Sequence, residues 1–169
     1  LYFDGTGAAG RVLNVGIRDG RVAEVSTAAL VGRRVVEAGG RWVMPGFVDI
    51  HTHYDAELIA APGLSESVRH GVTTVVIGSC SISTVLSGAE DCSDMFTRVE
   101  SVPREQVLPL LRETKTWEAP GEYVEFLGRQ PLGPNVAAFL GHSDLRTRAM
   151  GLGRAVDAAV RPTEAELQE

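Results

Sequence analysis

The stretch that decides the fold is VMPGFVDIHTHYD, residues 43–55. A Pro-Gly turn signal opens it, and the apolar residues that follow predict a short strand ending in the run HTH. Because side chains alternate along a strand, His51 and His53 are expected to project from one face, with Asp49 one step deeper. Two imidazoles at a strand end are suitable nitrogen donors for one metal ion.

Two more buried strands are predicted downstream. Residues 72–77 (VTTVVI) form a nearly unbroken β-branched run, and residues 135–140 (NVAAFL) form another apolar run. Such runs are typical of strands buried on both faces, as in a parallel sheet. Between them we expect helices over 65–70 (Ser65 as N-cap), 103–114 (kinked at Pro109) and 121–128, and mainly loop over 81–100.

Alternation of strand and helix after residue 45 predicts an α/β fold. Each strand ends in residues able to do chemistry, which is typical of (β/α)₈ barrels, whose catalytic groups lie at the C-terminal strand ends. We therefore expect residues 45–169 to be the start of a TIM-like (β/α)₈ barrel, with the first three strands present. Thr163 and Glu166 have the spacing of a helix N-terminus shortly before the chain stops, which indicates a truncated barrel.

A different pattern precedes the Pro-Gly signal. Leu13, Val15 and Ile17 alternate with polar residues or glycine, and Asp19-Gly20 offers the backbone angles of a tight hairpin turn. We expect residues 1–44 to form part of a small β-sandwich domain.

Two further residues end predicted strands and are candidates for the site. Cys80 follows the second strand, where it is either a zinc ligand or a buried structural cysteine, and position alone leaves both open. His142 follows the third strand beside Ser143 and Arg146, either as a substrate contact or as a polar residue at the start of a loop.

The other cysteine and another histidine have simpler interpretations. Cys92 lies in the polar run EDCSD and is expected to be inert. His70 sits where a histidine complements the partial negative charge of a helix C-terminus, so we interpret it as structural.

Composition excludes several classes of protein. The 169 residues are 44% hydrophobic and 22% charged, as in a soluble globular protein, and no apolar run is long enough to span a membrane. The net charge of −6 argues against nucleic acid and anionic membranes as partners. No secretion signal is evident and two cysteines do not make a disulfide scaffold, so we expect a cytoplasmic location.

The sequence resembles the amidohydrolase superfamily in the pattern apolar-Pro-Gly-apolar-x-Asp-x-His-x-His of residues 43–53. Segments 70–76, 78–80, 98–100 and 141–146, together with Tyr123, Leu127 and Met150-Gly151, narrow the resemblance to N-acyl-D-amino-acid deacylases, or D-aminoacylases. Gly-Ser-Cys-Ser replaces the family's usual Gly-Asn-Cys-Gly around Cys80.

The resemblance implies a zinc-dependent hydrolase, with one or two Zn²⁺ ions, that converts an N-acyl-D-amino acid to a carboxylate and a D-amino acid. His51, His53 and Cys80 match the family's metal ligands, and the cysteine stands in place of the carbamylated lysine of related enzymes. His142, Ser143 and Arg146 are expected to bind substrate. The family's later histidine ligands and catalytic aspartate have no counterpart here, so no catalytic base is expected within this chain.

Two alternatives stay open at this point. The chain could belong to a cyclic amidase, such as a dihydroorotase or hydantoinase, or be a non-catalytic fragment of an amidohydrolase. The Cys80 position and the run GHSDLR favour the first interpretation over the cyclic amidases. Neither the acyl group, the side-chain preference nor the oligomeric state follows from the sequence.

Overall fold

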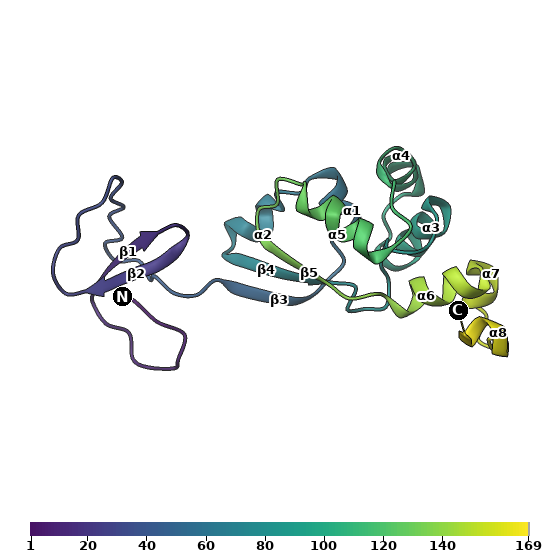
Figure 1. Ribbon diagram of the computed structural model, residues 1–169, viewed down its shortest axis with the longest axis horizontal. Helices are drawn as coiled ribbons and strands as arrows, with labels where there is room; N and C mark the ends of the chain where they lie inside the picture. The colour runs from purple at the N-terminus through teal and green to yellow at the C-terminus, as the bar shows by residue number, and fades with distance from the viewer. Residues whose placement is uncertain (169) are drawn as a thin grey trace. The chain divides into compact units, whose positions relative to one another are not determined.

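A computed structural model describes residues 1–168, in two compact units, Leu1–Gly46 and Phe47–Glu169 (Figure 1). The first unit holds an antiparallel hairpin of β1 (Asn14–Arg18) and β2 (Arg21–Ser26). Its turn uses positive φ angles at Asp19 (52°) and Gly20 (73°), as the Asp-Gly pair predicts. The described strands of this unit form a two-stranded sheet, so the sandwich stays a prediction.

The second unit is built on a parallel sheet in the order β3-β4-β5. Strand β3 spans Phe47–Thr52, β4 spans Val72–Ile77 and β5 spans Asn135–Ala138, so β5 ends two residues before the predicted Leu140. The prediction of three parallel strands is confirmed. The β3–β4 register shifts between Asp49 and Thr52, so the pairing of the two strands is irregular at His51.

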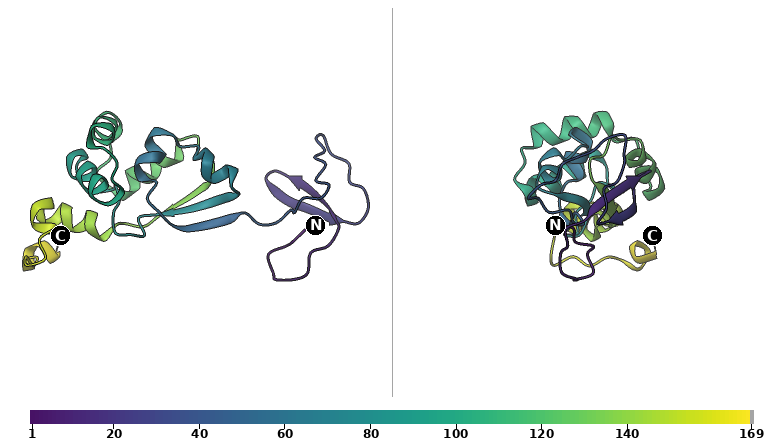
Figure 2. Two further views of the ribbon diagram at one scale, coloured as in Figure 1. Left: turned by 180° about the vertical axis from the view of Figure 1, so that it is seen from behind. Right: turned by 90° about the vertical axis from the view of Figure 1, so that its left-hand side faces the viewer.

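Helices cover one side of this sheet (Figures 1 and 2). They are α1 (Asp55–Ala60), α2 (Ser65–Arg69) and α5 (Pro120–Gly128). Leu64, with a left-handed φ of 40°, precedes α2, so the predicted N-cap at Ser65 is wrong by one residue. The helix at 121–128 is confirmed.

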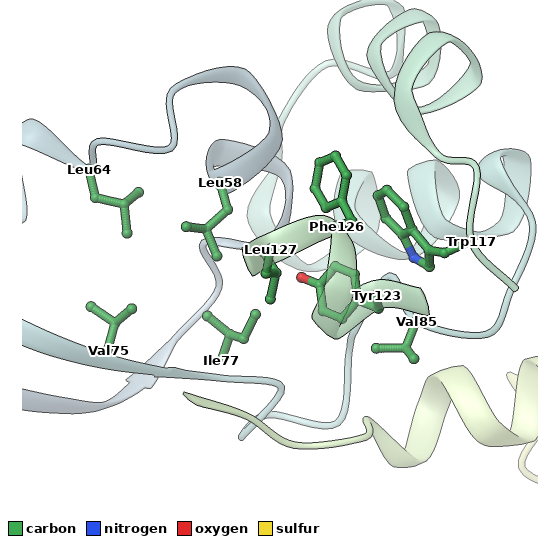
Figure 3. Packing of buried hydrophobic residues seen from close by; sticks show 9 residues of the cluster. All are labelled: Leu58, Leu64, Val75, Ile77, Val85, Trp117, Tyr123, Phe126 and Leu127. Carbon is green, nitrogen blue, oxygen red and sulfur yellow. The ribbon is translucent and has the colours of Figure 1, made fainter. Parts of the chain in front are cut away.

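The main core lies between β4 and these helices (Figure 3). Val75 and Ile77 of β4 are fully buried against Leu58 of α1 and Leu127 of α5. The predicted burial on both faces is wrong for β5, where every residue except the half-buried Val136 is exposed, whereas in β4 only Thr73 is exposed. Ile50 of β3 is also 70% exposed. Apolar side chains of the sheet therefore remain uncovered.

Residues 81–100 differ most from expectation. Instead of a loop they end in a three-turn helix, α3 (Ala89–Glu100), which packs against α4 (Arg104–Thr114). Their contact is a second core of buried residues: Ile82, Cys92, Met95, Phe96, Val107 and Leu111. Pro109 lies inside α4 with its side chain exposed.

Three helices end the chain: α6 (His142–Met150), α7 (Leu152–Ala155) and α8 (Glu164–Gln168). The predicted capping pattern before α8 is confirmed, since the Glu166 carboxylate accepts from the Thr163 amide at 2.7 Å and the Glu166 amide donates to the Thr163 hydroxyl at 3.3 Å. Within the described part of the chain, no helix is both long and apolar enough to cross a membrane.

Candidate metal centre

Three side chains of types that can bind a metal ion meet where β3 and β4 end. His51, His53 and Cys80 each offer a ligand atom, and these three atoms all lie within 4.8 Å of one another. The two imidazole rings have centroids 5.6 Å apart. The structure therefore brings together the three residues that the sequence predicted as metal ligands.

Hydrogen bonds between the two strands hold this arrangement. The Thr52 hydroxyl donates to the Val76 carbonyl at 3.2 Å, and the Ser79 hydroxyl donates to the Ile50 carbonyl at 2.8 Å. Between Val76 and Ser79 the chain turns at Gly78, which has a φ of 77° and whose added Cβ would lie 2.4 Å from the Phe139 carbonyl oxygen. Only glycine fits here, and this turn brings Cys80 to the end of β3.

Glu100, the last residue of α3, contacts Nδ1 of His53 through its carboxylate. A carboxylate on one ring nitrogen fixes the tautomer and leaves the other nitrogen free to bind a metal. The Nε2 atom of His53 is buried and has no hydrogen-bond partner among the described residues. No role for Glu100 follows from the sequence, because this residue is 47 positions from His53 and lies on a helix that was predicted as loop.

The two histidines line a pocket of about 590 Å³ between β3 and helices α1, α3 and α4. Asp49 lines it as well, but its carboxylate accepts the backbone amide of His51 at 3.3 Å. Asp55, which begins α1, is not among the lining residues; it is fully buried, and burial raises the pKa of its carboxyl to about 7. Helices α3 and α4 line the pocket with the apolar Phe96, Val107 and Leu110 and with the polar Glu100 and Gln106.

The predicted substrate-binding residues lie at the start of α6. His142 is exposed and lines a separate hollow of about 560 Å³ with Ser79 and Ser81. The Ser143 hydroxyl is 2.8 Å from the Ser81 hydroxyl, next to Cys80. The Arg146 guanidinium instead donates to the Ala155 carbonyl at 3.3 Å, which directs it toward α7.

Both cysteines are free thiols, in different surroundings. Cys80 is exposed, whereas Cys92 is buried in the α3–α4 core, where its thiol donates to the Ser87 carbonyl at 3.3 Å. Burial raises the pKa of the Cys92 thiol far above its usual value. Cys92 is thus a core residue, and a buried thiol of this kind agrees with the prediction that it is inert.

The donor set suits zinc. Zinc binds imidazole nitrogen at about 2.0 Å and thiolate at about 2.3 Å, so ligand atoms of a tetrahedral site lie roughly 3.5 Å apart. Ligand atoms within 4.8 Å of one another reach that spacing by side-chain rotation. The unpartnered Nε2 of His53 is a buried donor that such an ion would satisfy.

Comparison with known proteins identifies the family. The sequence profile of the amidohydrolase family matches residues 34–164, and the chain belongs to this family. It is 59% identical over 170 residues to an uncharacterized protein of Mycobacterium tuberculosis, covering 99% of this chain and 28% of that protein. To the N-acyl-D-glutamate deacylase of Alcaligenes xylosoxydans xylosoxydans it is 36% identical over 165 residues, covering 96% of this chain and 30% of the deacylase.

Comparison with solved structures gives the same family. A D-aminoacylase described by its binuclear metal centre superimposes with a TM-score of 0.79 at 32% identity, over 99% of this chain and 32% of that one. The N-acyl-D-glutamate deacylase of Bordetella bronchiseptica, solved with zinc and a phosphonate inhibitor, gives 0.73 at 34% identity, with the same coverage. These similarities show an α/β metal-dependent hydrolase fold. The chain spans about a third of the length of these relatives.

Proposed function

We propose that this chain contributes the first metal ligands of a zinc-dependent hydrolase that cleaves the linear amide bond of an N-acyl-D-amino acid. The products are a carboxylate and a D-amino acid. The observation that carries the proposal is the meeting of His51, His53 and Cys80 at the ends of two parallel strands. The deacylases among its relatives supply the substrate class.

The position of the chain's one lysine supports a site in which a cysteine is a metal ligand. Lys115 is half-buried after α4, where its ammonium group donates to the Trp117 carbonyl at 2.6 Å and lies over the Trp117 ring. It is therefore engaged away from the three donors, and burial lowers its pKa. Cys80 takes the place that a carbamylated lysine holds in related enzymes.

His51, His53 and Cys80 would hold the metal, with Glu100 orienting His53. Bound zinc supplies Lewis-acid chemistry, which polarises an amide carbonyl and makes water a better nucleophile at neutral pH. His142 and Ser143 border the Cys80 loop and would contact the substrate, and Arg146 would do so if it leaves the Ala155 carbonyl. A general base, an aspartate of the family, would come from residues outside this chain.

The fold that this function requires is a closed (β/α)₈ barrel. The parallel order β3-β4-β5, with metal-binding residues at the C-terminal strand ends, supports assigning residues 45–169 to the start of that barrel. Residues 1–44 would contribute to a small β-sandwich domain.

Metal content tests the site directly. The full-length protein, purified without added metal, should retain near-stoichiometric zinc, and Cys80→Ala and His51→Ala should each lose it. Matched controls are Cys92→Ala and His70→Ala, which remove the same side-chain types elsewhere and should keep the metal. Zinc retained in full by both Cys80→Ala and His51→Ala would refute the assignment.

Activity tests the substrate class. We expect the zinc-loaded protein to release D-amino acids from N-acetyl-D-amino acids and to leave the L enantiomers largely uncleaved. A protein that cleaves dihydroorotate or a hydantoin instead would be a cyclic amidase. A zinc-loaded protein that cleaves neither class would contradict the enzymatic interpretation and favour a non-catalytic role.

A further inference from the structure

Asp144, on the first turn of α6, is a fully buried carboxylate that binds a loop and not its own helix. It accepts from the Ser83 hydroxyl at 2.6 Å, and from the backbone amides of Val85 at 2.9 Å, Leu86 at 3.0 Å and Ser87 at 2.8 Å. Hydrogen bonds to an ionised acceptor are about twice as strong as neutral ones. A buried carboxylate with this many donors fixes residues 83–87 firmly.

The same loop carries Cys80 at its start, and a second set of contacts extends the anchor toward it. The Ser143 amide donates to the Ser81 carbonyl at 2.8 Å, and the two serine hydroxyls are 2.8 Å apart. The Gly141 amide donates to the Ser83 hydroxyl at 3.1 Å. An added Cβ at Gly141 would lie 2.5 Å from the Ser81 carbonyl oxygen, so the two segments touch through their backbones.

The conformation of the loop that follows Cys80 depends on these contacts. Ser81 has a φ of 70°, a left-handed conformation that a serine adopts only when surrounding contacts impose it. Cys80 is exposed, so packing on its own side chain does little to fix where its sulfur points. The contacts from residues 141–144 therefore fix the backbone conformation on the C-terminal side of Cys80.

We propose that Asp144 is a positioning residue for the metal site: through Ser83 and the amides of residues 85–87 it holds the Cys80 loop so that the thiolate lies beside His51 and His53. This inference rests on the proposed function, because it takes Cys80 to be a metal ligand. Residues that orient metal ligands without touching the metal typically contribute tenfold or more to metal affinity.

The test is Asp144→Asn in the full-length protein. We would measure zinc affinity by competition with a chromophoric chelator, and the thiolate-to-cobalt charge-transfer band after loading with Co²⁺. Both measurements are made at a temperature well below the midpoint of thermal unfolding. We expect zinc affinity to fall about tenfold or more and the cobalt band to weaken or shift.

Two controls separate positioning from general stability. Asp157→Asn makes the same change at an exposed carboxylate, and Leu111→Ala destabilises the α3–α4 core, to which Ile82 of the loop belongs, while leaving every hydrogen-bond partner of Asp144 in place. Both should keep the affinity and the band. If Asp144→Asn lowers the unfolding midpoint as Leu111→Ala does, yet leaves affinity and band unchanged, Asp144 is only structural and the inference is overturned.

Failure of the inference can be told from failure of the proposed function. If Cys80→Ala keeps full zinc affinity and the cobalt band, Cys80 is not a ligand. The positioning role of Asp144 and the proposed metal site are then both refuted. If Cys80→Ala abolishes the cobalt band while Asp144→Asn preserves it, only the positioning role of Asp144 is refuted. Should Asp144→Asn not fold, Ser83→Ala removes a single donor to the same carboxylate, and an unchanged affinity in that variant overturns the inference.

Discussion

The two cysteine side chains differ in exposure, and this difference predicts their chemical reactivity. Because the thiolate is the reactive species, the buried Cys92, whose pKa is raised by burial, should not react in the native protein. Cys80 is exposed and should react. Titration with a disulfide thiol reagent should modify one thiol per native chain and a second only after unfolding.

Zinc adds a second stage to this thiol experiment. If Cys80 is a metal ligand, zinc should slow its modification strongly, and a chelator should restore the rate. Rapid modification of Cys92 in the folded protein, or no protection of Cys80 by zinc, would contradict the environments described above.

Glu100 gives a second prediction for a single residue. Glu100→Gln keeps the size of the side chain but removes the charge that stabilises the Nδ1 proton of His53. We expect zinc affinity to fall about tenfold or more, as for other carboxylates that orient a ligating histidine. Glu105→Gln, the same change at an exposed residue of α4, should leave affinity unchanged in the same chelator competition.

How far the site could be predicted depends on sequence distance. The closeness of His51 and His53 follows from strand geometry, although the register shift between Asp49 and Thr52 does not. The approach of Cys80 follows once β3 and β4 are parallel neighbours. Glu100 and Asp144 reach the site through helix packing and loop contacts, and no local pattern encodes those contacts.

Helix α3 shows how a helix can be missed. Cys92, Met95, Phe96 and Val99 have the spacing i, i+3, i+4 and i+7 of an amphipathic helix, yet polar residues around Cys92 obscured the pattern. The helix has no side-chain N-cap, so it also lacked a start signal. Strand β4, with its β-branched run, and strand β3, which follows the Pro-Gly turn signal, were placed correctly.

The N-terminus of α8 gives a prediction on pH. The pKa of Glu166 is lowered from 4.5 to about 2, mainly by the Arg154 contact and then by Thr163. A lowered pKa means that the ionised form stabilises the folded state, so this contribution is complete above pH 4.5 and is lost as pH falls toward 2. Amide chemical shifts of residues 163–168 should follow that loss.

Two substitutions check the assignment. Glu166→Gln should remove the acid transition and leave α8 frayed at neutral pH, whereas Glu164→Gln, two residues away, should preserve it. A transition that survives in Glu166→Gln would mean that another group causes it.

At the scale of the whole second unit, the sheet is covered unequally. Helices α1, α2 and α5 bury Val75 and Ile77, while several large apolar side chains of the same sheet face solvent: Val48 is 57% exposed, Ile50 70% and Phe139 61%. In a closed barrel such side chains fill the interior. If residues 45–169 begin such a barrel, as proposed, its other strands would cover these side chains.

The uncovered side chains predict how residues 1–169 behave alone. Exposed apolar patches and unpaired strand edges favour association, so we expect this polypeptide to self-associate in a concentration-dependent manner. Ile50→Lys replaces one exposed apolar side chain by a charged one and should reduce association without unfolding the chain. Val124→Lys, at a similarly exposed position on α5, is the matched control and should have a smaller effect. Sedimentation velocity over a range of concentrations measures both, and a monomer throughout would contradict the prediction.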